Sequence, residues 1–264
     1  MARVGVVVPA YRPNATRLVA YCRSLVERLD PATVRVELDA PTAATLEALE
    51  GVPGRVTVNA VGRRRGKGAA ITAGFEALDG GIDVYAFADA DGSTPADSVA
   101  DVIAPVVAGE ADLAAGSRRH PDADVAAHQT LARRFMGDCF AWLARRVLDT
   151  ALYDYQCGAK ALTAGTWRAV RRHLHEPGFA WDIELIAAAG ALDRRIVEVP
   201  VRWEDRPGST VSPVRSSLGL ARGLLLARHR AGRLRGEGIH GALATRTDPP
   251  PALVDRLAAD AADE

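Results

Sequence analysis

The feature that most constrains the fold is a regular alternation of apolar runs with amphipathic segments through the first half of the chain. Short valine- and alanine-rich runs fit buried strands, and the segments between them carry apolar residues at helical spacing. This alternation is typical of βαβ units, so we expect an α/β fold with a mostly parallel sheet and helices on both faces. The predicted strands are Arg3–Val8, Val34–Leu38, Arg55–Ala60, Asp83–Ala88 and Asp112–Ala115, and the predicted helices are Ala15–Leu29, Thr42–Glu50, Lys67–Leu78 and Ala96–Ala108.

The pattern changes in the second half of the chain. A long helix is expected over Ala127–Leu148, then a short strand at Ala159–Thr163, two helices, and a strand at Ile196–Val201. Residues 213–236 interleave arginines with leucines, which predicts a helix that lies at a membrane interface. The tail contains PPP and repeated Ala and Asp, which predicts disorder. The expected organisation is a folded domain over 1–210, a basic amphipathic extension over 211–244 and an acidic disordered tail over 245–264.

Composition and motif spacing exclude several function classes. The formal net charge is +0 and no nucleic-acid motif is present, so nucleic acid is not an expected partner. The first strand is followed by PAYRPN instead of GxGxxG, and GRRRGKG at 62–68 lacks the P-loop spacing. These two departures argue against dinucleotide binding and against an ATPase. Three cysteines without CxxC spacing, no signal peptide and no apolar run of ~20 residues predict a cytoplasmic protein without a membrane span.

Two acids, Asp89 and Asp91, end the apolar run that leads into FADADGSTP. Residues i and i+2 of an extended strand face the same way, so both carboxylates are expected in one site. Their repulsion requires a helix N-terminus, a basic side chain or a metal ion nearby. Thr94 and Asp97 are expected to cap the next helix. Asp89 and Asp91 are then left for a divalent ion, Mg²⁺ or Mn²⁺, that also grips a diphosphate.

The distribution of basic residues adds two candidates. Of 33 basic residues only Lys67 and Lys160 are lysine, which hints that a compact ammonium group is needed at those positions. Lys67 begins a predicted helix, where the helix dipole disfavours a cation, so a phosphate contact is predicted for it. Lys160 is expected either to contact the nucleotide sugar or to pair with a core acid. Asp182 and Glu184 lie at a helix start, where the dipole favours acids in any case.

Seven motifs occur in one order along the chain. They are PAYxxN, GRRRGKGAAITAGF, FADADGSTP, GSR at 116–118, YQCGAKAL, FAWDIELI and VPVRWEDRPGST. Together they resemble glycosyltransferase family 2, and within it the dolichyl- or polyprenyl-phosphate glucosyl- and mannosyltransferases. The resemblance implies a glycosyltransferase-A fold, a UDP- or GDP-hexose donor, a Mg²⁺ or Mn²⁺ ion, a dolichyl or polyprenyl phosphate acceptor, and peripheral binding to the inner face of the cell membrane.

The resemblance also implies roles for individual residues. The nucleoside is assigned to Pro9, Tyr11 and Asp39, and the metal-bound diphosphate to Asp89, Ala90 and Asp91. The acceptor phosphate is assigned to Arg118 and Arg134, with Arg133 as the neighbouring alternative. Arg206 is expected to close over the nucleotide phosphates, where Lys67 and Lys160 also bind. The expected catalytic residues are Asp91, Arg118, Arg134 and Asp182.

Two other functions remain open. The first keeps the fold but transfers the sugar to a soluble or glycan hydroxyl, which needs a general base, either Asp182 or Glu184. The second is a catalytically inactive, membrane-associated homologue. It is suggested by departures from the family pattern at Arg12-Pro13 and Asp39-Ala40-Pro41-Thr42, and by Ser-Thr where the last motif commonly has Ser-Lys.

Overall fold

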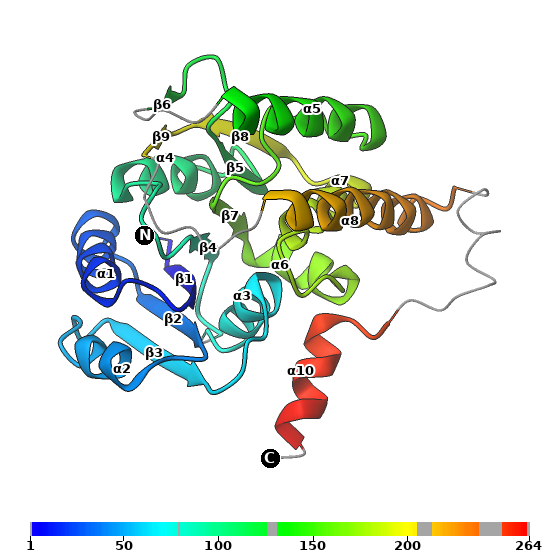
Figure 1. Ribbon diagram of the computed structural model, residues 1–264. Coiled ribbons are helices and arrows are strands. Elements are labelled where there is room, and N and C mark those ends of the chain that lie inside the picture. Colours follow the sequence, from blue (N-terminus) through cyan, green and yellow to red (C-terminus); the bar gives the residue numbers. More distant parts are fainter. Residues whose placement is uncertain (1, 79, 126–130, 205–212, 238–249, 263–264) are drawn as a thin grey trace.

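A computed structural model describes residues 2–78, 80–125, 131–204, 213–237 and 250–262, with side chains except at 131–136 and 213–218. The main sheet has the strand order β3-β2-β1-β4-β7-β5-β8 (Figure 1). All neighbours pair in parallel except β7, which runs antiparallel to both β4 and β5. The strands are β1 (Val4–Tyr11), β2 (Thr33–Asp39), β3 (Val56–Val61), β4 (Val84–Ala88), β5 (Leu113–Ser117), β7 (Ala159–Thr163) and β8 (Ile196–Pro200).

Helices cover both faces of this sheet, as the alternation predicts. Val6 and Val8 of β1 belong to one apolar core and Val7 to the other, because successive strand residues face opposite ways. One face packs against α1 (Ala15–Leu29), α2 (Ala43–Leu49) and α4 (Ala96–Val107). The other packs against α3 (Lys67–Glu76), α6 (Ala164–Val170) and α7 (Trp181–Ala191). Further elements are β6 (Asp124–Val125) paired with β9 (Arg202–Trp203), α5 (Leu131–Val147) and the short helix η1 (Arg171–His173).

Within the residues of the predicted extension the structure has a helix, α8 (Pro213–Leu234). Its apolar stripe, with Leu224, Ala227 and Ala231, is buried in the core shared with α7. Part of this helix is therefore a packing element of the domain, and its predicted contact with a membrane stays a prediction. No described helix is both long enough and apolar enough to cross a bilayer.

The prediction of a disordered tail is wrong for residues 250–262. They contain a helix, α10 (Leu253–Ala262), and Ala252, Leu253 and Val254 are buried in the same core as α3 and α7. The backbone NH of Leu253 donates to the carbonyl of Leu174 at 2.8 Å. Asp260 pairs with Arg63 at 2.5 Å. The composition indicates disorder, but burial of three apolar side chains and an ion pair hold this segment on the domain.

Candidate functional site

The carboxyl ends of three parallel strands meet at one edge of the sheet. Tyr11 ends β1, Asp39 ends β2, and Asp89 follows β4 directly. Because β7 runs antiparallel beside β4, with Phe87 opposite Lys160, the start of β7 lies at this edge too. The topology thus brings Asp89 and Lys160, far apart in the sequence, to neighbouring positions.

Asp89 is held against the start of β7. Its backbone NH donates to the carbonyl of Gly158 at 2.8 Å. A Cβ at position 158 would lie 2.8 Å from the Cβ of Asp89 and would overlap its carboxylate. Glycine is therefore required at position 158 if Asp89 is to keep this orientation. Gly158 belongs to the YQCGAKAL motif, but its contact with Asp89 appears only in the fold.

Asp91 lies in a tight turn and is exposed. It accepts a hydrogen bond from the backbone NH of Ser93 at 2.9 Å, and Gly92 has a φ of +65°. Tyr21 of α1 packs beneath this turn and donates its hydroxyl hydrogen to the carbonyl of Thr94 at 2.7 Å. Burial, with the charges of Asp89 and Asp91, raises the pKa of Tyr21, so it stays a neutral donor. No sequence signal pointed to Tyr21 as the support of this turn.

The predicted capping of the next helix by Thr94 and Asp97 is wrong. The cap position of α4 is Pro95, and no side chain makes a capping hydrogen bond there. Asp97 pairs instead with Arg28 of α1. The helix begins one residue later than the capping pattern requires, because Pro95 takes the position before the first turn.

Two buried ion-pair partners connect Asp89 to α7. Lys67 Nζ lies 2.9 Å from Asp89 and 3.0 Å from Asp182. Asp182 also accepts from Lys160 Nζ at 2.8 Å, and Lys160 donates to the carbonyl of Cys157 at 2.9 Å. The structure therefore brings together both predicted lysines and two predicted acids in one alternating chain of charges. Their formal charges cancel, which is what lets them be buried side by side.

The pKa shifts in this cluster follow from burial and pairing. Burial alone raises the pKa of Asp182, but Lys160 and Lys67 outweigh it and hold that pKa below its ordinary value. Burial opposes the charge of Lys67, yet Asp182 and Asp89 raise its pKa. Burial raises the pKa of Asp89; Lys67 opposes this rise and Asp91 adds to it. Asp89 is thus the member of the cluster that gains most from an added cation.

Asp39 is directed toward the loop before α3. Its carboxylate accepts from the backbone NH of Arg65 at 2.7 Å and of Gly66 at 3.1 Å, and from Arg65 Nε at 2.7 Å. Gly66 has a φ of +100°, and a Cβ there would meet the carbonyl oxygen of Pro177 at 2.5 Å. Asp39 therefore shapes the loop that precedes Lys67. Its predicted role toward the nucleoside stays a prediction.

Tyr11 carries two cations beside its ring. The guanidinium of Arg64 lies 4.3 Å from the ring centroid and that of Arg12 lies 5.3 Å away. These cation–π contacts place two positive charges beside the Tyr11 ring at the sheet edge. Pro9 is buried within β1, so its predicted contact with a nucleoside is less direct than that of Tyr11, which is half-buried. Ala90 is also half-buried.

Arg118, just beyond β5, is fixed by a partner that the sequence did not reveal. Its Nε and Nη2 donate to the two oxygens of Asp154 at 2.7 and 3.0 Å, and its guanidinium lies 5.7 Å from the ring of Trp203. Burial opposes ionisation of Asp154, but Arg118 lowers its pKa well below the usual range. Arg118 is therefore pre-oriented. The side chain of Arg134, with its neighbour Arg133, and the whole of Arg206 lie outside the described residues.

A protein-family profile matches the part of the chain that forms this sheet edge. The profile described as glycosyl transferase family 2 matches residues 5–179, which include Asp89, Asp91 and Lys67. The chain belongs to glycosyl transferase family 2. The resemblance drawn from the seven motifs is thereby confirmed.

Relatives within the family extend the match. Glycosyltransferase AglD of Haloferax volcanii is 30% identical over 231 residues, 84% of this chain and 36% of that protein. A dolichyl-phosphate beta-glucosyltransferase of Drosophila melanogaster is 30% identical over 241 residues, 84% of this chain and 73% of that protein. The chain thus spans about a third of the first family 2 relative and about three quarters of the second.

Solved structures confirm the predicted fold. Glucosyl-3-phosphoglycerate synthase from Mycobacterium tuberculosis, crystallised with Mn²⁺, UDP-glucose and phosphoglyceric acid, matches with a TM-score of 0.63 at 18% identity. The match covers 86% of this chain and 80% of that one. At this identity the likeness shows the fold alone, which is the glycosyltransferase-A fold expected for family 2.

The acids of this family 2 chain fit a divalent cation. Asp91 is exposed, and only one of the Asp89 oxygens, Oδ1, pairs with Lys67. In the described part of the chain, no three His, Cys, Asp or Glu side chains are grouped to hold a metal ion. The chain thus offers two carboxylates. That number suits Mg²⁺ or Mn²⁺, whose remaining positions are filled by water and substrate phosphates.

Proposed function

We propose that the protein transfers a hexose from a nucleotide sugar to a polyprenyl or dolichyl phosphate, with inversion at the anomeric carbon. The observation that carries the proposal is the pair Asp89 and Asp91 at the carboxyl end of β4, with Lys67 held against Asp89 by Asp182. In this proposal the two acids hold a metal-bound diphosphate, and Lys67 lies at the same sheet edge. The family 2 relatives named dolichyl-phosphate beta-glucosyltransferase support the choice of acceptor.

The reaction is a single displacement. An oxygen of the acceptor phosphate bonds to the anomeric carbon while the bond from that carbon to the donor diphosphate breaks. The nucleoside diphosphate leaves with the electron pair. Because the acceptor is already an anion, no strong general base has to remove a proton. What the chain must supply is alignment and compensation of negative charge on both sides of the sugar.

Residues of the site are suited to these two tasks. Arg118 presents a guanidinium fixed by Asp154, and guanidinium groups bind phosphate oxygens in pairs. Lys67 forms an ion pair with Asp89. In this proposal its ammonium group also stabilises the negative charge that develops on the leaving diphosphate. A divalent ion held by Asp89 and Asp91 would supply Lewis-acid stabilisation of the same leaving group.

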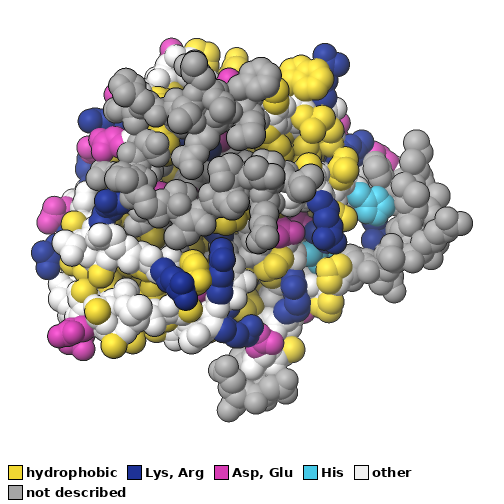
Figure 2. Space-filling view, viewed as in Figure 1, with side chains coloured by type: hydrophobic (Ala, Val, Ile, Leu, Met, Phe, Trp, Pro, Cys, Tyr) yellow, Lys and Arg dark blue, Asp and Glu magenta, His cyan; other side chains and the backbone are white. Residues whose placement is uncertain are grey.

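A position at the inner face of the cell membrane is part of this proposal. Figure 2 shows hydrophobic side chains gathered over the C-terminal half of α5. Trp142 and Leu143 there are 55% and 40% exposed, and Leu225 of the adjacent α8 is 64% exposed. Exposed apolar side chains beside the arginines of α8 support peripheral contact with a bilayer that holds the acceptor.

A hydroxyl acceptor receives less support. It would need a general base, yet Asp182 is buried between two lysines that lower its pKa. Glu184 accepts from the backbone NH groups of His175 and Glu176 and pairs with Arg230. Both candidate bases are committed to structural partners. Nucleotide binding without turnover on any acceptor would instead favour an inactive homologue.

A membrane-extract assay with radiolabelled UDP- and GDP-hexoses tests the proposal. We expect a chloroform-soluble, mild-acid-labile product that requires Mg²⁺ or Mn²⁺. The variant Gly158→Ala, which displaces the Asp89 carboxylate, should reduce kcat/KM by about 10²-fold. Gly165→Ala is the matched control. Its added Cβ would lie 3.8 Å from the nearest atom, so the activity of this variant should be unchanged. A water-soluble product, or equal activity of both variants, would contradict the proposal.

A further inference from the structure

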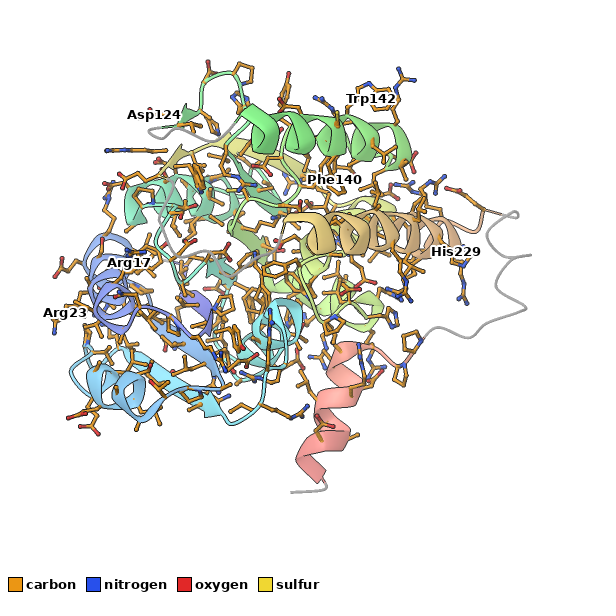
Figure 3. The ribbon with its side chains drawn as sticks, in the orientation of Figure 1. Arg17, Arg23, Asp124, Phe140, Trp142 and His229 are labelled. Carbon is orange, nitrogen blue, oxygen red and sulfur yellow. The ribbon has the colours of Figure 1, made fainter. Side chains whose placement is uncertain are left out.

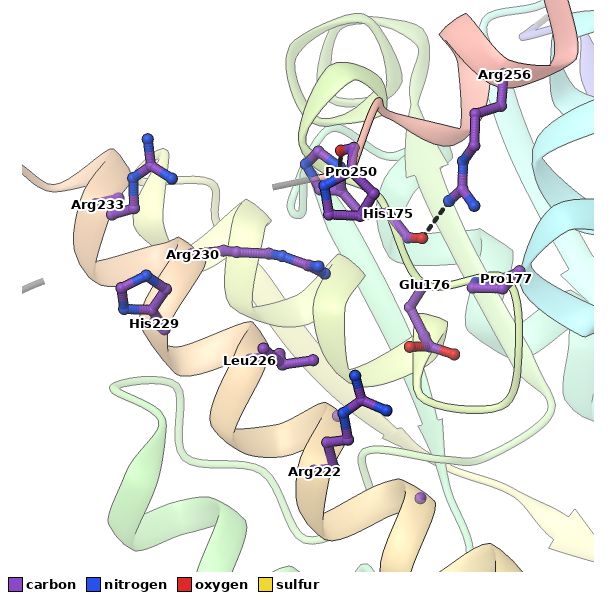
Figure 4. Close-up of a pocket in the computed structure, with 12 residues that line it drawn as sticks. His175, Glu176, Pro177, Arg222, Leu226, His229, Arg230, Arg233, Pro250 and Arg256 are labelled. Atoms are coloured by element: carbon purple, nitrogen blue, oxygen red, sulfur yellow. Dashed lines mark hydrogen bonds between the residues drawn. The ribbon is translucent and has the colours of Figure 1, made fainter. Parts of the chain in front are cut away.

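A cavity of about 550 Å³, apart from the sheet edge of the candidate site, lies between α8, the segment before α7 and the residues that lead into α10. Figure 4 shows Arg222 and Arg230 extending from α8 toward Glu176 and His175. None of its lining residues belongs to the sheet edge that carries Asp89, Lys67 and Arg118. The lining side chains that matter here are Arg222, Arg230, Arg233, Arg256, Glu176 and His175.

Positive charge in this cavity exceeds the negative charge available to balance it. Four arginines line it and Glu176 is the single lining carboxylate among the described residues. Glu184 does not line the cavity, but its ion pair with Arg230 compensates the charge of that arginine. In the described part of the chain, the side chains of Arg222 and Arg233 make no ion pair or hydrogen bond, and both residues are exposed.

The fourth arginine adds to the unbalanced charge. Arg256 Nη2 donates to the carbonyl of His175, and in the described part of the chain no carboxylate pairs with this guanidinium. A ligand that carries several anionic oxygens would compensate Arg222, Arg233 and Arg256 together.

We propose that this cavity binds a phosphate group, carried either by a lipid headgroup or by a soluble phosphate ester. Guanidinium groups match phosphate oxygens in charge and geometry, and Arg222, Arg233 and Arg256 reach the cavity from two helices. The cavity volume is larger than a phosphate group alone needs. It leaves room for part of the molecule to which the phosphate is attached. This site goes beyond the proposed transfer reaction and does not depend on it.

The first test measures thermal unfolding of the full-length protein against inorganic phosphate, with sodium chloride at matched ionic strength. Phosphate should raise the Tm of the wild type, because it binds the native state. The double variant Arg222→Gln/Arg233→Gln should bind phosphate about tenfold more weakly or worse. The control is Arg23→Gln/Arg168→Gln.

This control makes the same charge change at exposed positions that do not line the cavity. Figure 3 shows Arg23 and His229, a lining residue, at opposite sides of the molecule. Equal phosphate affinity in the two double variants would overturn the proposal.

The second test distinguishes the two sources of phosphate. The same proteins are sedimented with phosphatidylglycerol vesicles and with phosphatidylcholine vesicles. If a lipid headgroup is the ligand, Arg222→Gln/Arg233→Gln should lose about tenfold in binding to phosphatidylglycerol vesicles, and the control should not. If a soluble ester is the ligand, the two double variants should sediment equally while differing in phosphate affinity. Neither measurement uses a donor sugar. The phosphate site can therefore be tested even if the protein has no transferase activity.

Discussion

Two residues of the site edge, Arg12 and Ala40, adopt the left-handed backbone region with φ of 46° and 47°. They stand at two of the three places where the sequence departs from the family pattern. The left-handed region costs roughly 1–2 kcal/mol for residues other than glycine, asparagine and aspartate. The departures therefore store local backbone strain beside Tyr11 and Asp39 rather than rearranging the strands.

Replacing Ala40 should release that strain. We expect Ala40→Gly to raise the free energy of unfolding by about 1 kcal/mol, because the relief of strain exceeds the added entropy of the unfolded chain. Ala108→Gly is the control at an ordinary φ of −71°, and it should lower stability by about 0.5–1 kcal/mol. Urea unfolding of both variants measures the difference. The interpretation fails if Ala40→Gly is destabilised as much as Ala108→Gly.

Asp182 should make stability depend on pH in a defined window. Its pKa is held below the ordinary value of 3.8, so its ionised form stabilises the native state at neutral pH. That contribution is complete above 3.8 and is lost as the pH falls through the lower native-state pKa. Asp182→Asn leaves Lys160 and Lys67 short of a buried partner and should cost about 3–5 kcal/mol at pH 7. Urea unfolding from pH 7 to pH 3 should show this difference shrinking below pH 4; a constant difference would contradict the assignment.

At the scale of elements, α8 depends on one glycine to approach α7. A Cβ at Gly223 would overlap the Cβ of Ala180, the residue before α7. Gly223→Ala should therefore separate the two helices and cost about 1–3 kcal/mol, as overpacking does. Gly219→Ala, one turn earlier in α8, has nothing within 4 Å and should be neutral or stabilising by up to about 1 kcal/mol. Comparing the urea midpoints of these two variants tests the packing, and equal midpoints would refute it.

The elements also show where sequence reasoning holds and where it stops. The strands β1 to β4 and the helices between them were predictable, because each carries its own apolar periodicity. The site edge followed from the parallel topology, which placed Tyr11, Asp39 and Asp89 together. The pairing of Lys67 with Asp182 and of Arg118 with Asp154 did not follow. These contacts join residues on separate elements, and local patterns hold no information on which partner a charge will meet.

At the scale of the whole molecule, α10 shows how a segment of weak local signal becomes part of the core. It packs against α3 and η1, and Leu253 and Val254 are almost fully buried (Figure 1). Its Ala- and Asp-rich composition predicts disorder, and only docking supplies the burial that offsets its ordering entropy. This helix also carries Arg256 into the arginine-lined cavity, so α10, α8 and the segment before α7 jointly line that site.

The docking of α10 predicts a loss of global stability when its anchor is removed. Leu253→Ala deletes a buried side chain between α10 and the core and should lower the free energy of unfolding by about 2–4 kcal/mol. Ala258→Ser, on the exposed face of the same helix, should change it by less than about 0.5 kcal/mol. Urea unfolding monitored by tryptophan fluorescence measures both. If residues 250–262 were a disordered tail, the two variants would unfold at the same urea concentration as the wild type. A separation between them establishes instead that the C-terminal helix belongs to the cooperative unit that holds Lys67 and Asp182 in place.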